Sequence, residues 1–105
     1  MLTLHVSWSD CTRLVVLAGE LDMEGAAALE EAALAGTGTG PGTGTETELV
    51  LDFSQVDFVD STGMYSLVRI HRAWHERGGR VTMINLSDEI SEVFELVGLT
   101  GGDFS

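Results

Sequence analysis

The first eighteen residues combine a strict alternation with a continuous apolar run. In residues 2–8 the even positions are apolar and the odd positions polar, which is typical of a strand with one buried face. Residues 9–12 are mostly turn formers, and residues 13–18 are mainly apolar. The pattern therefore predicts a β-hairpin at the start of the chain.

Two further segments predict strands later in the chain. Residues 48–53 are continuously apolar at their centre, and this pattern favours a central strand covered on both faces. Val50 and Leu51 are then both expected to be buried. Residues 80–85 predict a fourth strand, which follows the helix-ending pair Gly78-Gly79.

Three segments have the composition or spacing of helices. Asp22 is placed to cap a helix over residues 23–34, whose inner face would carry Met23, Leu29 and Ala33. The second helix spans residues 61–77. Its apolar stripe consists of Met64, Leu67, Val68, His71 and Trp74.

A third helix is predicted over residues 89–97, capped by Ser87-Asp88. Its inward positions are Ile90, Val93, Phe94 and Val97. The order β-β-α-β-α-β-α predicts a single α/β domain over residues 1–105. Parallel pairing with right-handed crossovers gives a four-stranded mixed sheet with the helices mainly on one face.

Residues 36–45 form a low-complexity Gly/Thr stretch, interrupted by the chain's one proline. Glycine is entropically costly to fix and has no side chain to bury, so a flexible surface loop is expected. Phosphate binding is disfavoured, because the stretch lacks the Walker lysine and precedes a strand instead of a helix.

The charge of the chain is strongly one-sided. The chain has seventeen acidic residues, five arginines and no lysine, which gives a net charge of −12. Binding of nucleic acid or of an anionic membrane surface requires a basic patch, so neither is expected. The negative net charge would suit a basic protein partner, and it is equally consistent with a surface that only keeps the protein soluble.

Cys11 is the chain's one cysteine, which excludes an intrachain disulfide and favours a cytoplasmic location. No apolar stretch approaches the length of a membrane span, and no signal peptide pattern is expected. His71 and His75 stand four residues apart, but no third metal ligand is evident. Neither a metal nor a cofactor is expected.

The segment from Leu49 to Gly63 carries the candidate chemistry. It predicts a buried strand, an acidic turn, and the start of a helix at Asp60-Ser-Thr-Gly63. No general base and no phosphate-cradling loop accompany the hydroxyl pair. The hydroxyl of Ser61 is then either a helix cap or a group that another protein modifies.

The chain contains three motifs spread over nearly its whole length, in the order Gly19-Glu-Leu-Asp22, Asp60-Ser-Thr-Gly63 and Phe94-Glu-Leu-Val-Gly-Leu99. In these motifs and in the predicted order of its elements, the chain resembles the anti-sigma factor antagonists of the STAS domain family. The resemblance implies a STAS-like fold with a shortened or absent C-terminal helix. Where the family usually has Gly-Leu-Gly after the hydroxyl pair, this chain has Gly63-Met64-Tyr65.

The resemblance also implies a function. The unphosphorylated antagonist would bind an anti-sigma factor that is also a serine kinase, and so free a sigma factor; phosphorylation at Ser61 would end the binding and a phosphatase would restore it. Thr62 is the second candidate acceptor. The residues expected to contact the partner are Asp22, Asp60, Ser61, Thr62, Gly63 and Tyr65.

Two other classes of function stay open at this point. A STAS-type accessory subunit of a membrane transporter complex would form a fixed complex with an ATPase and have no phosphorylation cycle. An enzyme with Ser61 as nucleophile would need a base, and no motif places His5, His71 or His75 for that role.

Overall fold

The computed structural model describes residues 1–34, 47–96 and 102–103. The strands are β1 (Leu2–Ser9), β2 (Thr12–Leu21), β3 (Glu48–Val59), β4 (Arg80–Ile84) and β5 (Gly102–Asp103). The helices are α1 (Met23–Leu34), α2 (Ser61–Glu76) and α3 (Asp88–Leu96). None of the helices in these residues is long and apolar enough to cross a membrane.

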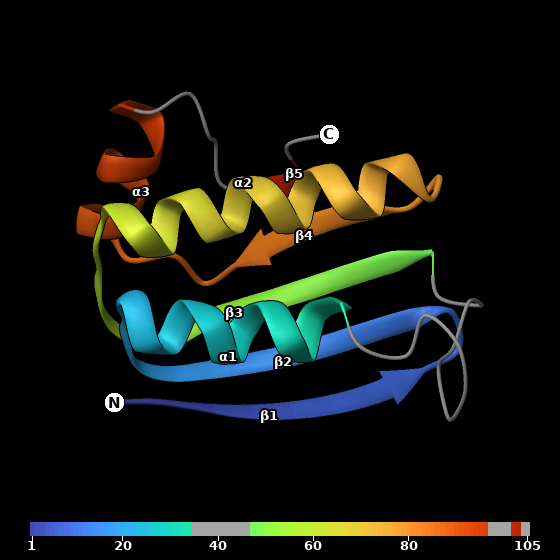
Figure 1. Ribbon diagram of the computed structural model, residues 1–105, viewed down its shortest axis with the longest axis horizontal. Coiled ribbons are helices and arrows are strands. Elements are labelled where there is room, and N and C mark those ends of the chain that lie inside the picture. Colours follow the sequence, from blue (N-terminus) through green and yellow to red (C-terminus); the bar gives the residue numbers. More distant parts are fainter. Residues whose placement is uncertain (35–46, 97–101, 104–105) are drawn as a thin grey trace.

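The strands form one mixed sheet in the order β1-β2-β3-β4-β5 (Figure 1). β1 is antiparallel to β2, β2 and β3 are parallel, as are β3 and β4, and β5 is antiparallel to β4. The predicted mixed sheet of four strands is thus confirmed. The two-residue β5 was not predicted, because so short a strand has no periodicity to recognise.

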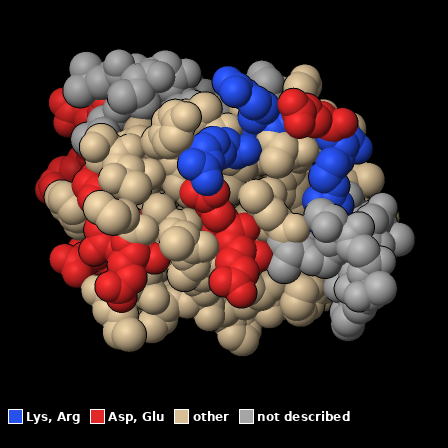
Figure 2. Space-filling view, in the orientation of Figure 1, with Lys and Arg blue, Asp and Glu red and all other residues tan. Residues whose placement is uncertain are grey.

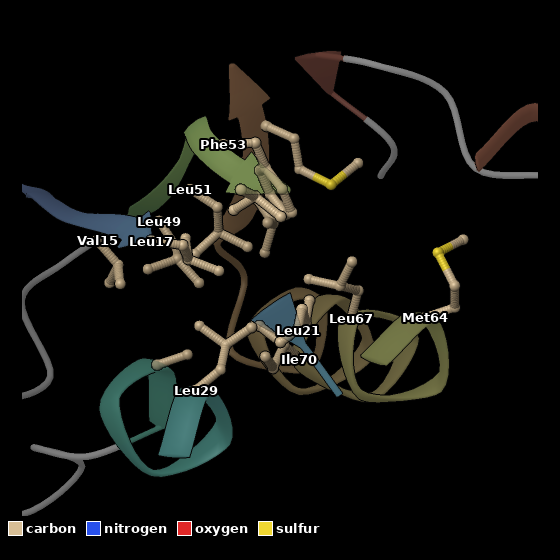
Figure 3. Close-up of a cluster of buried hydrophobic side chains, with 14 of the residues drawn as sticks. Val15, Leu17, Leu21, Leu29, Leu49, Leu51, Phe53, Met64, Leu67 and Ile70 are labelled. Atoms are coloured by element: carbon tan, nitrogen blue, oxygen red, sulfur yellow. The ribbon is translucent and has the colours of Figure 1, made fainter. Parts of the chain in front are cut away.

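The helices α1 and α2 lie side by side on one face of the sheet (Figure 1). Alternate residues of β2, β3 and β4 point into the space between the layers, where they meet Leu29 of α1 and Leu67 and Ile70 of α2 (Figure 3). The strand residues of this core include Val15, Leu17, Leu49, Leu51, Phe53, Val81 and Met83. Phe53 meets Phe94 of α3 edge to face, with ring centroids 5.8 Å apart.

The expectation that β3 is covered on both faces is wrong. Leu51 is fully buried, but Val50 is only half-buried. Helices cover one face of the sheet, so alternate residues of β3 differ in burial. β3 is also longer than predicted and reaches Val59, because it continues to pair with β2 through two register shifts.

The helix boundaries agree with the prediction to within one residue. Met23 was expected to face inward but is 71% exposed, and Gly25 and Ala26 are buried in its place. On α2, the predicted stripe omits Ser66 and Ile70, both of which are buried. Ile90 and Phe94 of α3 are buried as expected; the side chain of Val93, residue Val97 and residues 36–45 lie outside what the structure describes.

Arg13 of β2 is buried beneath the end of α1. Its side chain donates from Nη1 to the carbonyl oxygens of Ala32 and Ala33, at 3.1 and 3.0 Å. Nε1 of Trp74 donates to the same Ala33 oxygen at 3.0 Å, and the Arg13 guanidinium lies 5.4 Å from the centre of the Trp74 ring. The last carbonyls of α1, which have no partner within the helix, are therefore satisfied from β2 and α2.

Candidate functional site

The carboxyl ends of β2 and β3 lie next to each other, and each leads through an aspartate into a helix. Leu21 and Val59 are partners in the parallel register. The backbone N–H of Asp60 donates to the carbonyl oxygen of Leu21 at 3.2 Å. Since Asp22 follows Leu21 directly, the strand pairing brings the two helix starts to one edge of the sheet.

The two aspartates cap their helices in the same way. Asp60 has extended backbone angles, and its Oδ1 accepts a hydrogen bond from the N–H of Gly63 at 2.8 Å. Oδ1 of Asp22 accepts from the N–H of Gly25 at 2.9 Å. Both starts therefore follow the pattern Asp-x-x-Gly, in which the carboxylate satisfies one of the free amides of the first turn.

Both glycines are required by close packing. A Cβ atom on Gly63 would lie 2.4 Å from the carbonyl oxygen of Leu21, and one on Gly25 would lie 2.8 Å from that of Glu20. Cβ contacts this short are essentially never seen in folded proteins, so a side chain at either position would force its surroundings to shift. The missing side chains let each helix start approach the end of β2.

Ser61 and Thr62 occupy the first two positions of α2, and both are exposed. Because Asp60 is the capping residue, the interpretation of Ser61 as the helix cap is wrong. In residues 1–34 and 47–96, neither hydroxyl makes a hydrogen bond to the protein. The Ser61 hydroxyl therefore makes no hydrogen bond that stabilises the described part of the fold. It lies at a helix start, where partial positive charge and unpaired N–H groups favour an anion.

Three large apolar side chains are exposed close to this hydroxyl in the chain or in the fold. Tyr65 lies one turn further along α2 and is 63% exposed, and Phe58, just before the turn, is 50% exposed. Met23 follows the Asp22 cap at the neighbouring helix start. We call the surface formed at the two helix starts by Met23, Ser61, Thr62 and Tyr65 the acceptor face.

Tyr65 is held by its neighbours on α1 and α2. The Arg69 guanidinium lies 5.5 Å from the centre of the Tyr65 ring, and it also forms an ion pair with Glu30 of α1. Tyr and Arg are the residue types that most often dominate binding energy at protein interfaces. The positions of Arg69 and Met23 near these residues were not recognised from the sequence, since they depend on the packing of α1 against α2.

The acceptor face adjoins a shallow pocket and an acidic region. Asp57, Phe58, Val59, Glu89 and Ile90 line a pocket of about 150 Å³ between the β3–α2 turn and α3. In Figure 2 acidic side chains gather toward the left, where α1 and α2 begin, whereas the visible arginines lie further along α2. The starts of α1 and α2 thus lie at the acidic end of the molecule.

The structure brings together the residues expected at the site and separates the histidines from it. Asp22, Asp60, Ser61, Thr62, Gly63 and Tyr65 all lie at the two helix starts or within the first turns. His71 and His75 stack on each other with ring centroids 6.1 Å apart, and His71 is ten residues beyond Ser61, about 15 Å along the helix axis. His5 lies on the face of the sheet opposite to the helices, so no histidine is placed as a base for Ser61.

Comparison with known proteins agrees with this architecture. The family model described as "Mlab, STAS domain" matches residues 4–103. An anti-sigma-B factor antagonist of Listeria monocytogenes is 29% identical over 86 residues, which cover 82% of this chain and 71% of that protein.

Two solved structures share the fold. The crystal structure of an anti-sigma factor antagonist from Mycobacterium paratuberculosis superposes with a TM-score of 0.76 at 26% identity, over 93% of this chain and 79% of that one. The unphosphorylated anti-sigma factor antagonist SpoIIAA superposes with a TM-score of 0.74 at 21% identity, over 98% and 90% of the two chains. With three motifs, the strand order and a family match over almost its whole length, the chain belongs to the STAS domain family and is similar to its anti-sigma factor antagonists.

Proposed function

We propose that this protein is an anti-sigma factor antagonist whose binding is switched by phosphorylation of Ser61. In its unphosphorylated form it binds an anti-sigma factor that is also a serine kinase, and this binding releases a sigma factor. The observation that carries the proposal is the exposed Ser61 hydroxyl at the first position of α2, with capping left to Asp60. The named relatives support the class of partner.

In the proposed reaction, the kinase transfers the γ-phosphoryl group of ATP to Oγ of Ser61. The new P–O bond replaces the bond to ADP, and the hydroxyl proton leaves to a base of the kinase. A phosphatase reverses the change by hydrolysis to serine and inorganic phosphate. Nothing in this cycle requires a base from the antagonist, which fits the distance of the histidines from Ser61.

Phosphorylation is expected to act on binding and not on folding. A phosphate adds about −1.5 to −2 charge. At the start of α2 the free amides and the helix dipole tolerate that charge. The same charge would lie one helical turn from Tyr65, whose exposed ring a partner is proposed to cover, and next to Asp60. A partner that fits the neutral face would then have to bury a dianion, which is costly.

The direct test is phosphorylation by the host's anti-sigma kinases with ATP, with the modified residue mapped by mass spectrometry. The expected result is phosphate on Ser61 in the wild type and in Thr62→Ala, and none in Ser61→Ala. Met23 supplies a matched control, because it holds the equivalent first position of α1. Ser61→Ala combined with Met23→Ser should stay unmodified if the kinase recognises the whole acceptor face.

Binding titrations complete the test. The kinase should bind wild type and Ser61→Ala with similar affinity, and the phosphorylated protein much more weakly. Phosphate found only on Thr62, or equal affinity of both forms, would refute the switch. A stable complex with a transporter ATPase that forms without any phosphorylation would instead identify the protein as a transporter accessory subunit.

A further inference from the structure

β1 is an edge strand of the sheet in the part of the chain that the structure describes. Among the described strands it pairs only with β2, along its whole length from Leu2 to Ser9. The N–H and C=O groups that point away from β2 are therefore open to another strand. Such an edge is a ready template for pairing, and most proteins protect it.

The usual means of protection are absent from β1. The strand contains no lysine, no proline and no acidic residue, and its pairing with β2 has no bulge. This is unusual in a chain with a net charge of −12. The opposite edge of the sheet differs, because it is formed by β5, which has only two residues. Trp8, near the end of β1, is 47% exposed.

We propose that β1 pairs with β1 of a second copy of this chain, in an antiparallel arrangement about a twofold axis at His5. This register places Leu2 opposite Trp8 of the other copy and Leu4 opposite Val6. All four apolar side chains of β1 then meet apolar partners on the helix side of the sheet. A shift by one residue would place apolar side chains opposite polar ones, and a shift of the axis to Val6 would leave Leu2 without a partner.

The polar side of the strand also fits this register. Thr3 comes to lie opposite Ser7, and His5 opposite His5 of the second copy. Both Thr3 and His5 are exposed, on the face of the sheet that the helices do not cover. The two sheets would join into one continuous sheet with the helices of both copies on the same side.

The acceptor face stays accessible in this dimer. α1 lies between α2 and the β1 edge (Figure 1), so Ser61 of each copy is on the side away from the twofold axis. Dimerisation through β1 therefore does not depend on the proposed phosphorylation. The two proposals can be tested independently.

The expected dimer is weak and strengthened by salt. One strand pair buries less surface than the roughly 1,200–2,000 Å² of a standard stable interface. Two copies with a net charge of −12 also repel each other, and added salt screens that repulsion. Sedimentation should show a monomer–dimer equilibrium that shifts toward dimer with protein concentration and with NaCl.

Charge substitutions at His5 test the register. His5→Glu and His5→Lys each place two like charges opposite one another, and each should raise the dissociation constant by roughly fivefold. An equimolar mixture of the two variants should recover dimerisation, because the pair then has opposite charges. His5→Thr is the neutral control and should dimerise like the wild type.

A cross-link provides a second measurement. His5→Cys in a Cys11→Ser background should oxidise readily to a covalent dimer, since directly opposite Cα atoms of antiparallel strands lie about 4.5–5.5 Å apart, within the roughly 4.4–6.8 Å that a disulfide spans. Thr3→Cys in the same background is the control; the two Thr3 positions are four residues apart along the strand, about 13 Å. A monomer at every concentration in high salt would overturn the proposal, as would a dimer that neither His5 charge variant weakens.

Discussion

The two helix starts at the carboxyl edge of the sheet are built alike and differ in what they expose. Both follow Asp-x-x-Gly, with the carboxylate bonded to the glycine N–H and the glycine packed against the end of β2. Between these fixed residues, α1 has Met23-Glu24 and α2 has Ser61-Thr62. The fold thus determines the first and fourth positions of each pattern and leaves the second and third free for function.

The comparison separates the residues of the Asp60–Gly63 turn that stabilise the fold from the residue that is proposed to be modified. Asp60 and Gly63 belong to the same motif as Ser61, yet their counterparts Asp22 and Gly25 perform the same structural work without a hydroxyl. Substitutions at equivalent positions of α1 and α2 should therefore have similar effects on folding. Their effects on partner binding and phosphorylation should differ.

The largest effect on stability is expected at the glycines. Gly63→Ala should lower the free energy of unfolding by about 1–3 kcal/mol, because the new methyl group overlaps the Leu21 carbonyl oxygen. Gly25→Ala should cost less, since its Cβ would lie 2.8 Å from a backbone oxygen instead of 2.4 Å. Urea denaturation of both variants measures the difference. A neutral Gly63→Ala would show that α2 can move away from β2.

The aspartate caps come next. Asp60→Ala and Asp22→Ala should each cost about 0.5–2 kcal/mol of stability, since each leaves a first-turn amide without its carboxylate. Asp60→Asn should recover most of the loss, because an amide oxygen can also accept the bond. Thermal melts of the four proteins test this. Loss in only one of the two Ala variants would break the structural equivalence of the helix starts.

A negative charge at the acceptor position should be tolerated by the fold. Ser61→Asp is expected to change stability by less than about 1 kcal/mol, in the stabilising direction, because the carboxylate lies at the positive end of α2. Met23→Asp should behave in the same way at the start of α1. Circular dichroism melts provide the stability of both variants, and titration with the kinase should show a large loss of affinity for Ser61→Asp.

The smallest effect is expected for Ser61→Ala. The hydroxyl neither caps the helix nor bonds to the described part of the protein, so the stability change should stay within about 0.5 kcal/mol. A loss near the size of the Asp60→Ala effect would contradict the assignment of capping to Asp60. Mass spectrometry of the same variant after kinase treatment checks the loss of the acceptor.

The sequence by itself determined the order of the first seven elements, the Asp22 cap of α1 and the candidate hydroxyl, because these depend on local periodicity and capping chemistry. It could not assign the cap to Asp60 instead of Ser61, since both residue types cap helices and only the backbone geometry separates them. Nor could it show that Val50 is half-buried, that Met23 is exposed or that Arg13 holds the end of α1. Those outcomes depend on which face of the sheet the helices cover and on contacts between residues far apart in the chain, and only the tertiary structure decides them.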